Sequence, residues 1–331
     1  MSKKINIKSL LIVFAVLLVI VVLVAIRDSK KGDRSFKVDL IPLDSAQVTA
    51  ITIYPRSYKD NTIKLQKENG IWRLLKGDKS YTAEKNTVKE ILNTLTHLKA
   101  ERVAATDKEK WATFEVNDTS ATRVTLGTGR KTGADLYIGK FSYQQPPNSN
   151  PYNYGQQGKM TTYVRLAGDK NVYAVDGFLS MMFNRKTNDF RNKTIINSDR
   201  LDWTRLSFTY PGDSSFVMNR ENNKWMINGL LADSASVIRY FNSIYRLKNS
   251  DFVDDKKPQS SSPEFSLKIE GKNFANPIQV NAYAADTTNN FLIASSQNKD
   301  TYFSSKKSKL TATLFVGKNH FLKQQTLTKH N

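Results

Sequence analysis

The chain contains no cysteine and only three histidines among its 331 residues. The lack of a thiol excludes a cysteine nucleophile, a cysteine-ligated metal site and a lipid-modified cysteine anchor. His320 and His330 lie near the C-terminus without other metal-ligating residues in support, and His97 lies beside the apolar stripe of a predicted helix. We therefore expect no metal and no cofactor. The absence of cysteine also suits an extracytoplasmic setting.

Motifs of common enzymes are missing as well. There is no G-x-S-x-G nucleophile elbow and no Walker phosphate loop. A Ser-His-Asp arrangement stays open, because its members need not be adjacent in sequence. Paired carboxylates for sugar cleavage could come from Asp254-Asp255 or from Asp199 and Asp202, which lie in turn-like stretches where solvated acids are common. The sequence favours a non-enzymatic protein over a hydrolase.

Acidic residues are outnumbered, and the formal net charge is +20. Such an excess attracts polyanions such as lipid headgroups or acidic cell-envelope polymers. No run of five Lys/Arg residues and no nucleic-acid-binding signature occurs, so we expect no nucleic acid as partner. Scattered basic residues that serve solubility are the alternative.

A long apolar run extends from Leu10 to Ile26 without a charged residue. A helix of this length measures about 26 Å, close to the ~30 Å hydrocarbon core of a bilayer. The run therefore predicts a single transmembrane anchor. A cleaved signal peptide is the alternative, but it needs a small residue before the cleavage site, where Leu23 stands. Basic residues flank both ends, so orientation follows only from the short N-terminal tail, which favours an extracytoplasmic soluble part.

Two stretches of the sequence resemble each other in a way that indicates an internal repeat. Residues 63–74 and 216–227 both alternate apolar and polar residues around a polar turn, which predicts a β-hairpin in each. Trp72 and Trp225 occupy matching positions. We expect these two residues to anchor the cores of the repeats, with a ligand platform as the alternative.

A helix is predicted after each hairpin. The two apolar stripes have the same spacing at a constant offset of 149 positions, and they consist of Val88, Ile91, Leu92, Leu95 and Leu98 in one copy and Val237, Tyr240, Phe241, Ile244 and Leu247 in the other. We therefore predict an α+β fold: an N-terminal transmembrane helix, then two tandem similar units of antiparallel strands, each packed with an amphipathic helix. The predicted boundaries are 1–34 for the tail, anchor and linker, 35–196 for the first unit and 197–331 for the second.

One segment of the first copy has no counterpart of similar length in the second. Residues 140–161 are rich in Pro, Asn, Gln and Tyr and predict a long loop. Its tyrosines Tyr143, Tyr152 and Tyr154 could stack on sugars or peptides, which makes the loop a candidate interaction site. A tolerated surface insertion is the alternative.

Five short motifs, in their order along the chain, resemble a bacterial family, domain-of-unknown-function family 4340. They are Glu68-Asn69-Gly70-Ile71-Trp72, Leu98-Lys99-Ala100-Glu101-Arg102-Val103, Leu136-Tyr137-Ile138-Gly139, Tyr163-Val164-Arg165 and Phe190-Arg191-Asn192-Lys193. The resemblance covers residues 45 to about 255. The stretch Trp111-Ala112-Thr113-Phe114-Glu115-Val116 departs from the Gly-x-x-x-P pattern of the family.

The resemblance implies a membrane-anchored protein often encoded beside a transporter permease and a gliding-motility-type auxiliary protein. It supplies no catalytic residue. We therefore expect a non-enzymatic accessory module, held at the bacterial inner membrane by one span, whose partners are envelope proteins such as a permease or auxiliary subunit. Anionic lipid or wall polymer are further possible partners. A cell-wall or glycan-binding module that uses the 140–161 loop is the alternative.

Overall fold

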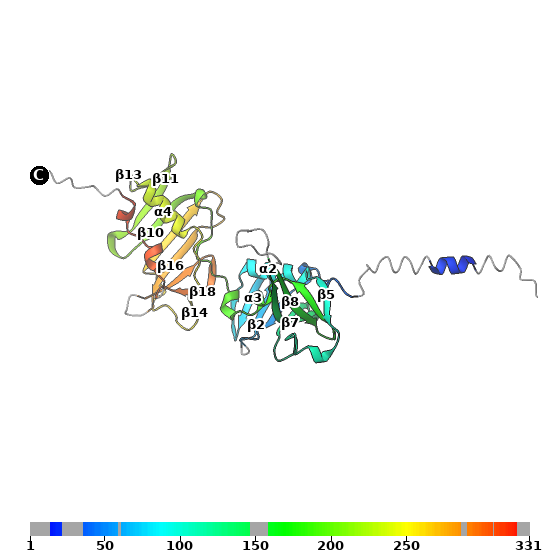
Figure 1. Ribbon diagram of the computed structural model, residues 1–331. Helices are drawn as coiled ribbons and strands as arrows, with labels where there is room; N and C mark the ends of the chain where they lie inside the picture. Colours follow the sequence, from blue (N-terminus) through cyan, green and yellow to red (C-terminus); the bar gives the residue numbers. More distant parts are fainter. Residues whose placement is uncertain are drawn as a thin grey trace, which may run out of the picture.

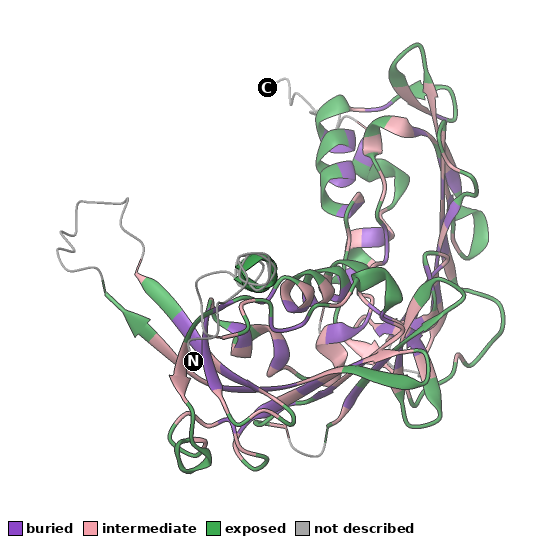
Figure 2. Cartoon of the chain, turned by 90° about the vertical axis from the view of Figure 1, so that its right-hand side faces the viewer, coloured by how far each residue is buried: buried purple, intermediate pink, exposed green. Residues whose placement is uncertain are grey.

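The computed structural model describes residues 14–21, 36–58, 61–145, 158–285, 290–306 and 308–322, which form two large antiparallel sheets (Figure 1). We call the sheet of β1–β9 with its helices unit 1, and the sheet of β10–β18 with its helices unit 2. In Figure 2 the helices of each unit lie on one side of its curved sheet.

Unit 1 contains nine strands in the spatial order β4-β3-β2-β1-β6-β7-β8-β9-β5. Neighbouring strands pair antiparallel throughout. The strands are β1 (Ala50–Tyr54), β2 (Ile63–Glu68), β3 (Ile71–Lys76), β4 (Lys79–Thr82), β5 (Ala100–Ala105), β6 (Thr122–Thr128), β7 (Lys131–Gln144), β8 (Lys159–Leu166) and β9 (Val172–Asp176).

Unit 2 repeats this order as β13-β12-β11-β10-β15-β16-β17-β18-β14. Its strands are shorter at both edges. They are β10 (Trp203–Thr209), β11 (Phe216–Glu221), β12 (Lys224–Ile227), β13 (Leu230–Leu231), β14 (Phe252–Val253), β15 (Phe265–Gly271), β16 (Ile278–Ala284), β17 (Phe291–Ser295) and β18 (Asn298–Ser304).

Helices are few. Each unit has one amphipathic helix and one short one: α2 (Lys85–Thr96), α3 (Leu179–Phe183), α4 (Ser234–Ile244) and α5 (Leu310–Leu314). Single 3₁₀ turns complete the described elements: η1 (Ser45–Gln47), η2 (Lys108–Lys110), η3 (Thr187–Phe190), η4 (Arg200–Asp202), η5 (Gly212–Ser214) and η6 (Lys318–Phe321).

The predicted fold class, an α+β fold behind a transmembrane helix, is therefore wrong. Two nine-stranded sheets dominate the described residues, and strands such as β6 and β16 show the alternating burial of a sheet with one covered face. No helix among the described residues is long and apolar enough to cross a membrane, which also overturns the single-pass prediction. Within the predicted span, residues 14–21 are helical, and Leu10 and Ile26 lie outside the described residues.

The two sheets match rung by rung. In unit 1 one rung of directly paired residues runs from Tyr81 on the edge strand through Leu74, Leu65 and Ile51 to Leu126. The matching rung of unit 2 consists of Leu230, Ile227, Met218, Leu206 and Ile269. All inner members of both rungs are buried, whereas the edge residue is buried in unit 1 and exposed in unit 2. A position in one sheet can therefore be compared directly with its counterpart in the other.

Tight turns fix this register. The predicted hairpin β2–β3 forms, with Asn69 and Gly70 at φ values of 48° and 81°. These left-handed values at both central residues fit a two-residue hairpin turn whose twist matches that of the strands. Asn222 and Asn223 make the corresponding turn between β11 and β12, at 47° and 62°, and Asn228 and Gly229 make the next turn, between β12 and β13, at 49° and 82°.

Each sheet buries its helix-covered face in a core of its own. The α2 stripe contributes Val88, Ile91 and Leu95 to the core of unit 1, as the spacing predicts. The core of unit 2 is richer in aromatic residues and includes the fully buried Trp203, 4.7 Å from the Phe241 ring of α4. Each core is complete within its unit, so neither core depends on contacts between the units.

A small third cluster lies on unit 1 beneath residues 106–120, between β5 and β6. Its centre is the buried Arg165, whose guanidinium lies 3.8 Å from the Trp111 ring centroid and 4.0 Å from that of Tyr137. The Arg165 Nε donates a hydrogen bond to the Val116 carbonyl at 3.0 Å. A cation between two aromatic faces fastens this segment to the sheet.

Gly139 is where the 106–120 segment comes closest to the sheet. A Cβ at this position would overlap the Phe114 carbonyl oxygen and lie 2.7 Å from Val116 Cγ1. We expect Gly139→Ala to lower the free energy of unfolding by about 1–3 kcal/mol, because the backbone must move to admit the methyl group. Chemical denaturation measures the loss.

Gly317→Ala is the matched control, since nothing lies within 4 Å of a Cβ there. Its φ of −72° also suits alanine. Equal stability of the two variants would contradict the close approach at Gly139.

Candidate functional site

The edge of unit 1 meets the opposite edge of unit 2, and a buried arginine lies at the centre of this junction. Arg191 follows η3, and its side chain is 0% exposed. Its guanidinium carbon lies 3.7 Å from the ring centroid of Tyr81 in unit 1 and 3.9 Å from that of Phe252 in unit 2. One of its nitrogens pairs with Asp254 at 2.8 Å. Arg191 thus binds both units at once.

Asp254 of unit 2 binds two cations at the junction. Besides Arg191, the Lys76 ammonium donates to its second oxygen at 2.8 Å. Burial raises the pKa of Asp254, but these two hydrogen bonds outweigh burial and lower the pKa to about 2. The neighbouring Tyr81 shows the opposite shift: burial, together with the nearby carboxylate, raises its pKa to about 12. The carboxylate is therefore ionised, and it is engaged in holding the units together.

A second acid of unit 2 caps the edge strand of unit 1. Asp300 on β18 pairs with Arg73 at 2.7 Å. The same carboxylate accepts hydrogen bonds from the Thr82 backbone N–H at 3.0 Å and from its hydroxyl at 2.7 Å. Cations and edge donors of unit 1 thus face Asp254 and Asp300 of unit 2 at this part of the junction.

Beside the junction a cleft of about 900 Å³ opens between the units. We call it the inter-unit cleft. One wall comes from the β2–β3 hairpin and the start of α2, and the other from the linker and the loop after α4. Its lining residues are Gly70, Ile71, Trp72, Thr82, Ala83, Glu84, Lys85, Asn86, Asn192, Thr194, Asn197, Arg246, Lys248 and Gln297.

Several polar groups of this cleft are already engaged within the protein. The Gln297 side-chain amide bonds the backbone of Asn197 through both its oxygen and its nitrogen, at 2.7 and 3.1 Å. Lys248 lies 3.5 Å from one carboxylate oxygen of Glu84. The other oxygen of Glu84 is buried without a hydrogen-bond donor among the described residues. These contacts stiffen the cleft walls.

Several groups of the cleft remain available to a ligand. Lys85 and Arg246 are exposed and form no ion pair within the described part of the chain, although Arg246 lies 5.3 Å from the ring centroid of the adjacent Tyr245. Trp72 packs its ring against the core of unit 1, and its indole N–H makes no hydrogen bond with a described residue. Asn86 and Asn197 are exposed lining residues with side-chain amides. The cleft therefore offers two cations, two amides and one half-buried indole.

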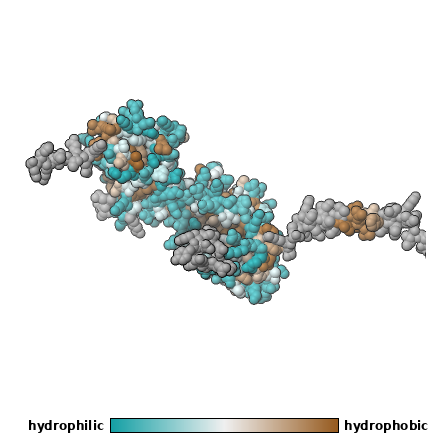
Figure 3. Space-filling view, turned by 45° about the horizontal axis from the view of Figure 1, so that its top comes forward, coloured by the Kyte–Doolittle hydropathy of each residue, from teal (hydrophilic) through white to brown (hydrophobic). Residues whose placement is uncertain are grey.

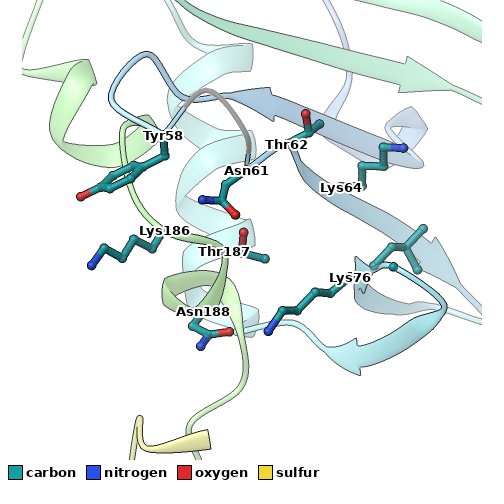
Figure 4. Close-up of a pocket in the computed structure, with 10 residues that line it drawn as sticks. Tyr58, Asn61, Thr62, Lys64, Lys76, Lys186, Thr187 and Asn188 are labelled. Atoms are coloured by element: carbon teal, nitrogen blue, oxygen red, sulfur yellow. The ribbon is translucent and has the colours of Figure 1, made fainter. Parts of the chain in front are cut away.

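A second, shallower hollow of about 590 Å³ lies on unit 1 (Figure 4). Lys64, Lys76 and Lys186 line it, together with Tyr58 and polar side chains. Figure 4 shows Lys64 and Lys186 extending away from each other, and Lys76 is held by Asp254. These lysines do not converge on one ligand position, so the inter-unit cleft is the stronger candidate.

The comparisons with known proteins agree with the order of motifs in the sequence. The family model "Domain of unknown function (DUF4340)" matches residues 72–267, more than half of the 331-residue chain. The chain belongs to the DUF4340 family. No curated protein and no solved structure matches it. The match runs from β3 of unit 1 to β15 of unit 2 and so includes Arg73, Arg191 and Asp254 of the junction, whereas Asp300 lies beyond it.

Residues of the motifs that carry the sequence resemblance have structural roles in the described part of this DUF4340 protein. Trp72 fills the flank of a hairpin, Gly139 admits the 106–120 segment, and Arg165 and Arg191 are each stacked between two aromatic rings. The motifs thus maintain the sheet of unit 1, its covering segment and the junction.

The candidate residues from the sequence are only partly gathered at the site. Trp72 packs against the core and also lines the inter-unit cleft, whereas Trp225 packs at 5.0 Å from the Phe241 ring away from the cleft. Tyr143 is 55% exposed at the end of β7, and it does not line the cleft. Tyr152 and Tyr154 lie outside the described residues, so an interaction role for their loop stays a prediction.

The acids considered for sugar cleavage have other partners in the structure. Asp254 belongs to the junction, Asp199 accepts a hydrogen bond from the Leu201 backbone at 2.9 Å, and Asp202 accepts one from Asn273 at 3.0 Å. Across the described ranges, no three His, Asp or Glu side chains gather closely enough to hold a metal.

The sequence interpretation missed Glu84, Arg246 and Asp300, and it named Asp254 only as a candidate acid for sugar cleavage. The one available signal was position: Glu84 precedes the first predicted helix, and Arg246 and Lys248 flank the last apolar residue of the second. That these positions face each other depends on how the units meet, which no local pattern encodes.

We expect Asp254→Asn to lower the free energy of unfolding at pH 7 by about 2–4 kcal/mol, because Arg191 then lies buried without a charged partner. The stabilisation is present above the ordinary pKa of 3.8 and is lost as pH falls toward 2, since the unfolded chain takes up the proton first. Denaturation between pH 6 and pH 2.5 should therefore show a shallower pH dependence for the variant than for the natural chain.

Asp255→Asn is the control, because this exposed neighbour has no ion pair within the described residues. A pH dependence that is the same in Asp254→Asn, Asp255→Asn and the natural chain would show that Asp254 does not couple the units.

Proposed function

We propose that this DUF4340 protein is a non-catalytic accessory module that binds an acidic segment of a partner protein in the inter-unit cleft. The observation that carries the proposal is that two exposed cations without an ion pair among the described residues, Lys85 and Arg246, share one cleft of about 900 Å³ with the half-buried indole of Trp72. The cations would bind carboxylates, and the indole would cover an apolar side chain.

The chemistry of the cleft supports a peptide rather than a sugar. Sugar sites commonly combine amide and carboxylate groups that bind hydroxyls. The cleft has exposed amides at Asn86 and Asn197, but its one lining carboxylate, Glu84, has one oxygen facing Lys248 and the other buried, whereas its two exposed cations suit carboxylates of a peptide. The net charge of +20 adds a long-range attraction for an acidic partner.

The nature of the partner rests on the family resemblance. We propose that the acidic segment belongs to an envelope transporter permease or to its auxiliary subunit. The module would then act outside the cytoplasm, at the cell envelope of a bacterium. The rigid walls of the cleft suit such a role, because a preformed site loses little conformational entropy on binding.

The double variant Lys85→Glu, Arg246→Glu tests the proposal. Tagged full-length protein is used to capture the partner from detergent extracts. We expect the double variant to capture at least about tenfold less partner, since both cleft cations become acids. Quantitative mass spectrometry of the captured proteins measures the change. Lys85 lies in the first turn of α2, where an acid suits the helix, so folding should be retained.

Lys131→Glu, Lys272→Glu is the matched control, because it makes the same change in net charge at exposed positions outside the cleft. Equal capture by both double variants would contradict a role for the cleft. Binding to isolated wall polymer without capture of any protein would instead support the glycan-binding alternative.

A further inference from the structure

The residues that precede the two long helices are both acids, and they occupy one position of the duplicated fold. Glu84 precedes α2, and Asp233 precedes α4 at the offset of 149 positions that also relates the two apolar stripes. The Glu84 N–H donates to the carbonyl of Phe190, and the Asp233 N–H donates to that of Phe321. The contacts of the two carboxylates can therefore be compared directly.

Of these two acids, the one in unit 2 caps its helix with its side chain. The Asp233 carboxylate accepts a hydrogen bond from the Ser236 backbone N–H at 2.9 Å. Glu84 is one methylene longer and makes no such bond to α2. A carboxylate at this position ordinarily binds a free N–H of the first turn and stabilises the helix. Unit 1 lacks that stabilisation because its acid has another partner.

The Glu84 side chain reaches across to unit 2 instead. Its Oε1 lies 3.5 Å from the Lys248 Nζ, and its Oε2 is buried without a hydrogen-bond donor among the described residues. The two side chains are 15% and 51% exposed. Both residues line the inter-unit cleft, and Glu84 is the one acid among the described residues that do so. The cleft thus contains a carboxylate of the protein itself beside one of its cations.

This contact adds little to holding the units together. The Arg191–Asp254 pair is shorter, at 2.8 Å, and its arginine is fully buried. The Glu84–Lys248 pair is longer, its cation is half exposed, and one carboxylate oxygen gains no donor from it. Hydrophilic residues dominate the visible face where the units meet (Figure 3). An ion pair open to water contributes little net stability, so Lys248 can exchange Glu84 for another carboxylate at small cost.

We propose that Glu84 sets how tightly the inter-unit cleft binds an acidic segment, because its own carboxylate competes with the segment for Lys248. This inference rests on the proposed function and adds Lys248 to Lys85 and Arg246 as a third cation of the same site. A carboxylate of the partner that binds Lys248 takes the place of the Glu84 Oε1. The longer side chain at the capping position of unit 1 thus serves the cleft rather than the helix.

Glu84→Asp tests the competition without a change of net charge. The shorter side chain no longer reaches Lys248 and instead caps α2, as Asp233 caps α4, so folding is retained. The probe is a fluorescein-labelled peptide with one leucine among glutamates. We expect its dissociation constant to fall at least about threefold, because Lys248 becomes available to the peptide. Fluorescence anisotropy with the full-length protein in detergent measures the change.

Lys248→Met shows whether the gain passes through this lysine. Lys248→Met alone and Lys248→Met combined with Glu84→Asp should bind the peptide equally, because the contested cation is missing from both. Glu90→Asp is the matched control, since it removes the same methylene from an exposed acid of α2 that does not line the cleft. It should bind the peptide like the natural chain.

Unchanged or weaker binding by Glu84→Asp would overturn the proposal, because Glu84 would then hold Lys248 in place rather than compete for it. A gain that persists in the Lys248→Met background would overturn it as well. Loss of binding in Lys85→Glu, Arg246→Glu together with unchanged binding by Glu84→Asp would refute the competition and leave the proposed function standing. Equal binding by the natural chain and by Lys85→Glu, Arg246→Glu would contradict the proposed function, and no binding by any form would refute both.

Discussion

A single buried guanidinium joins the two halves of this protein. Arg191 lies between an aromatic ring of each unit, and its charge is matched by Asp254. Removing either partner leaves an uncompensated charge where water is excluded, which costs more than the pair itself contributes. The junction brings Trp72 and Arg246, which come from different units, to one cleft. The candidate site therefore depends on this contact, although neither unit needs it for its own core.

Local patterns were sufficient to predict individual elements. The Asn69-Gly70 turn, the hairpin around it and the stripe of α2 all lie where the sequence places them, because turn conformation and hydrophobic periodicity are set by near neighbours. The overall class was wrong because two visible helices were given the same weight as many short strands. Strands such as β13 and β14, of two residues each, have no periodicity to detect.

The site could not be predicted in the same way. Arg191 and Asp254 are 63 positions apart, and Arg73 and Asp300 are 227 apart. Such pairs are brought together by the meeting of two sheet edges, which depends on the shape of both units at once. The motif around Arg191 did identify one essential residue. Its stacking partners, however, were apparent only once Tyr81 and Phe252 were placed on facing edges.

The matching edge strands, β4 of unit 1 and β13 of unit 2, differ in how they would respond to dissolved salt. Dissolved ions weaken attraction between partly exposed charges such as Lys76 and Arg73 and their acids, whereas salts excluded from protein surfaces strengthen contact between apolar groups. Rising ionic strength should therefore weaken the ion pairs of the inner junction, whereas the exposed leucines of β13 carry no charge for it to screen. A duplicated sheet with one charged and one apolar edge thus places two surfaces of different salt dependence in one chain.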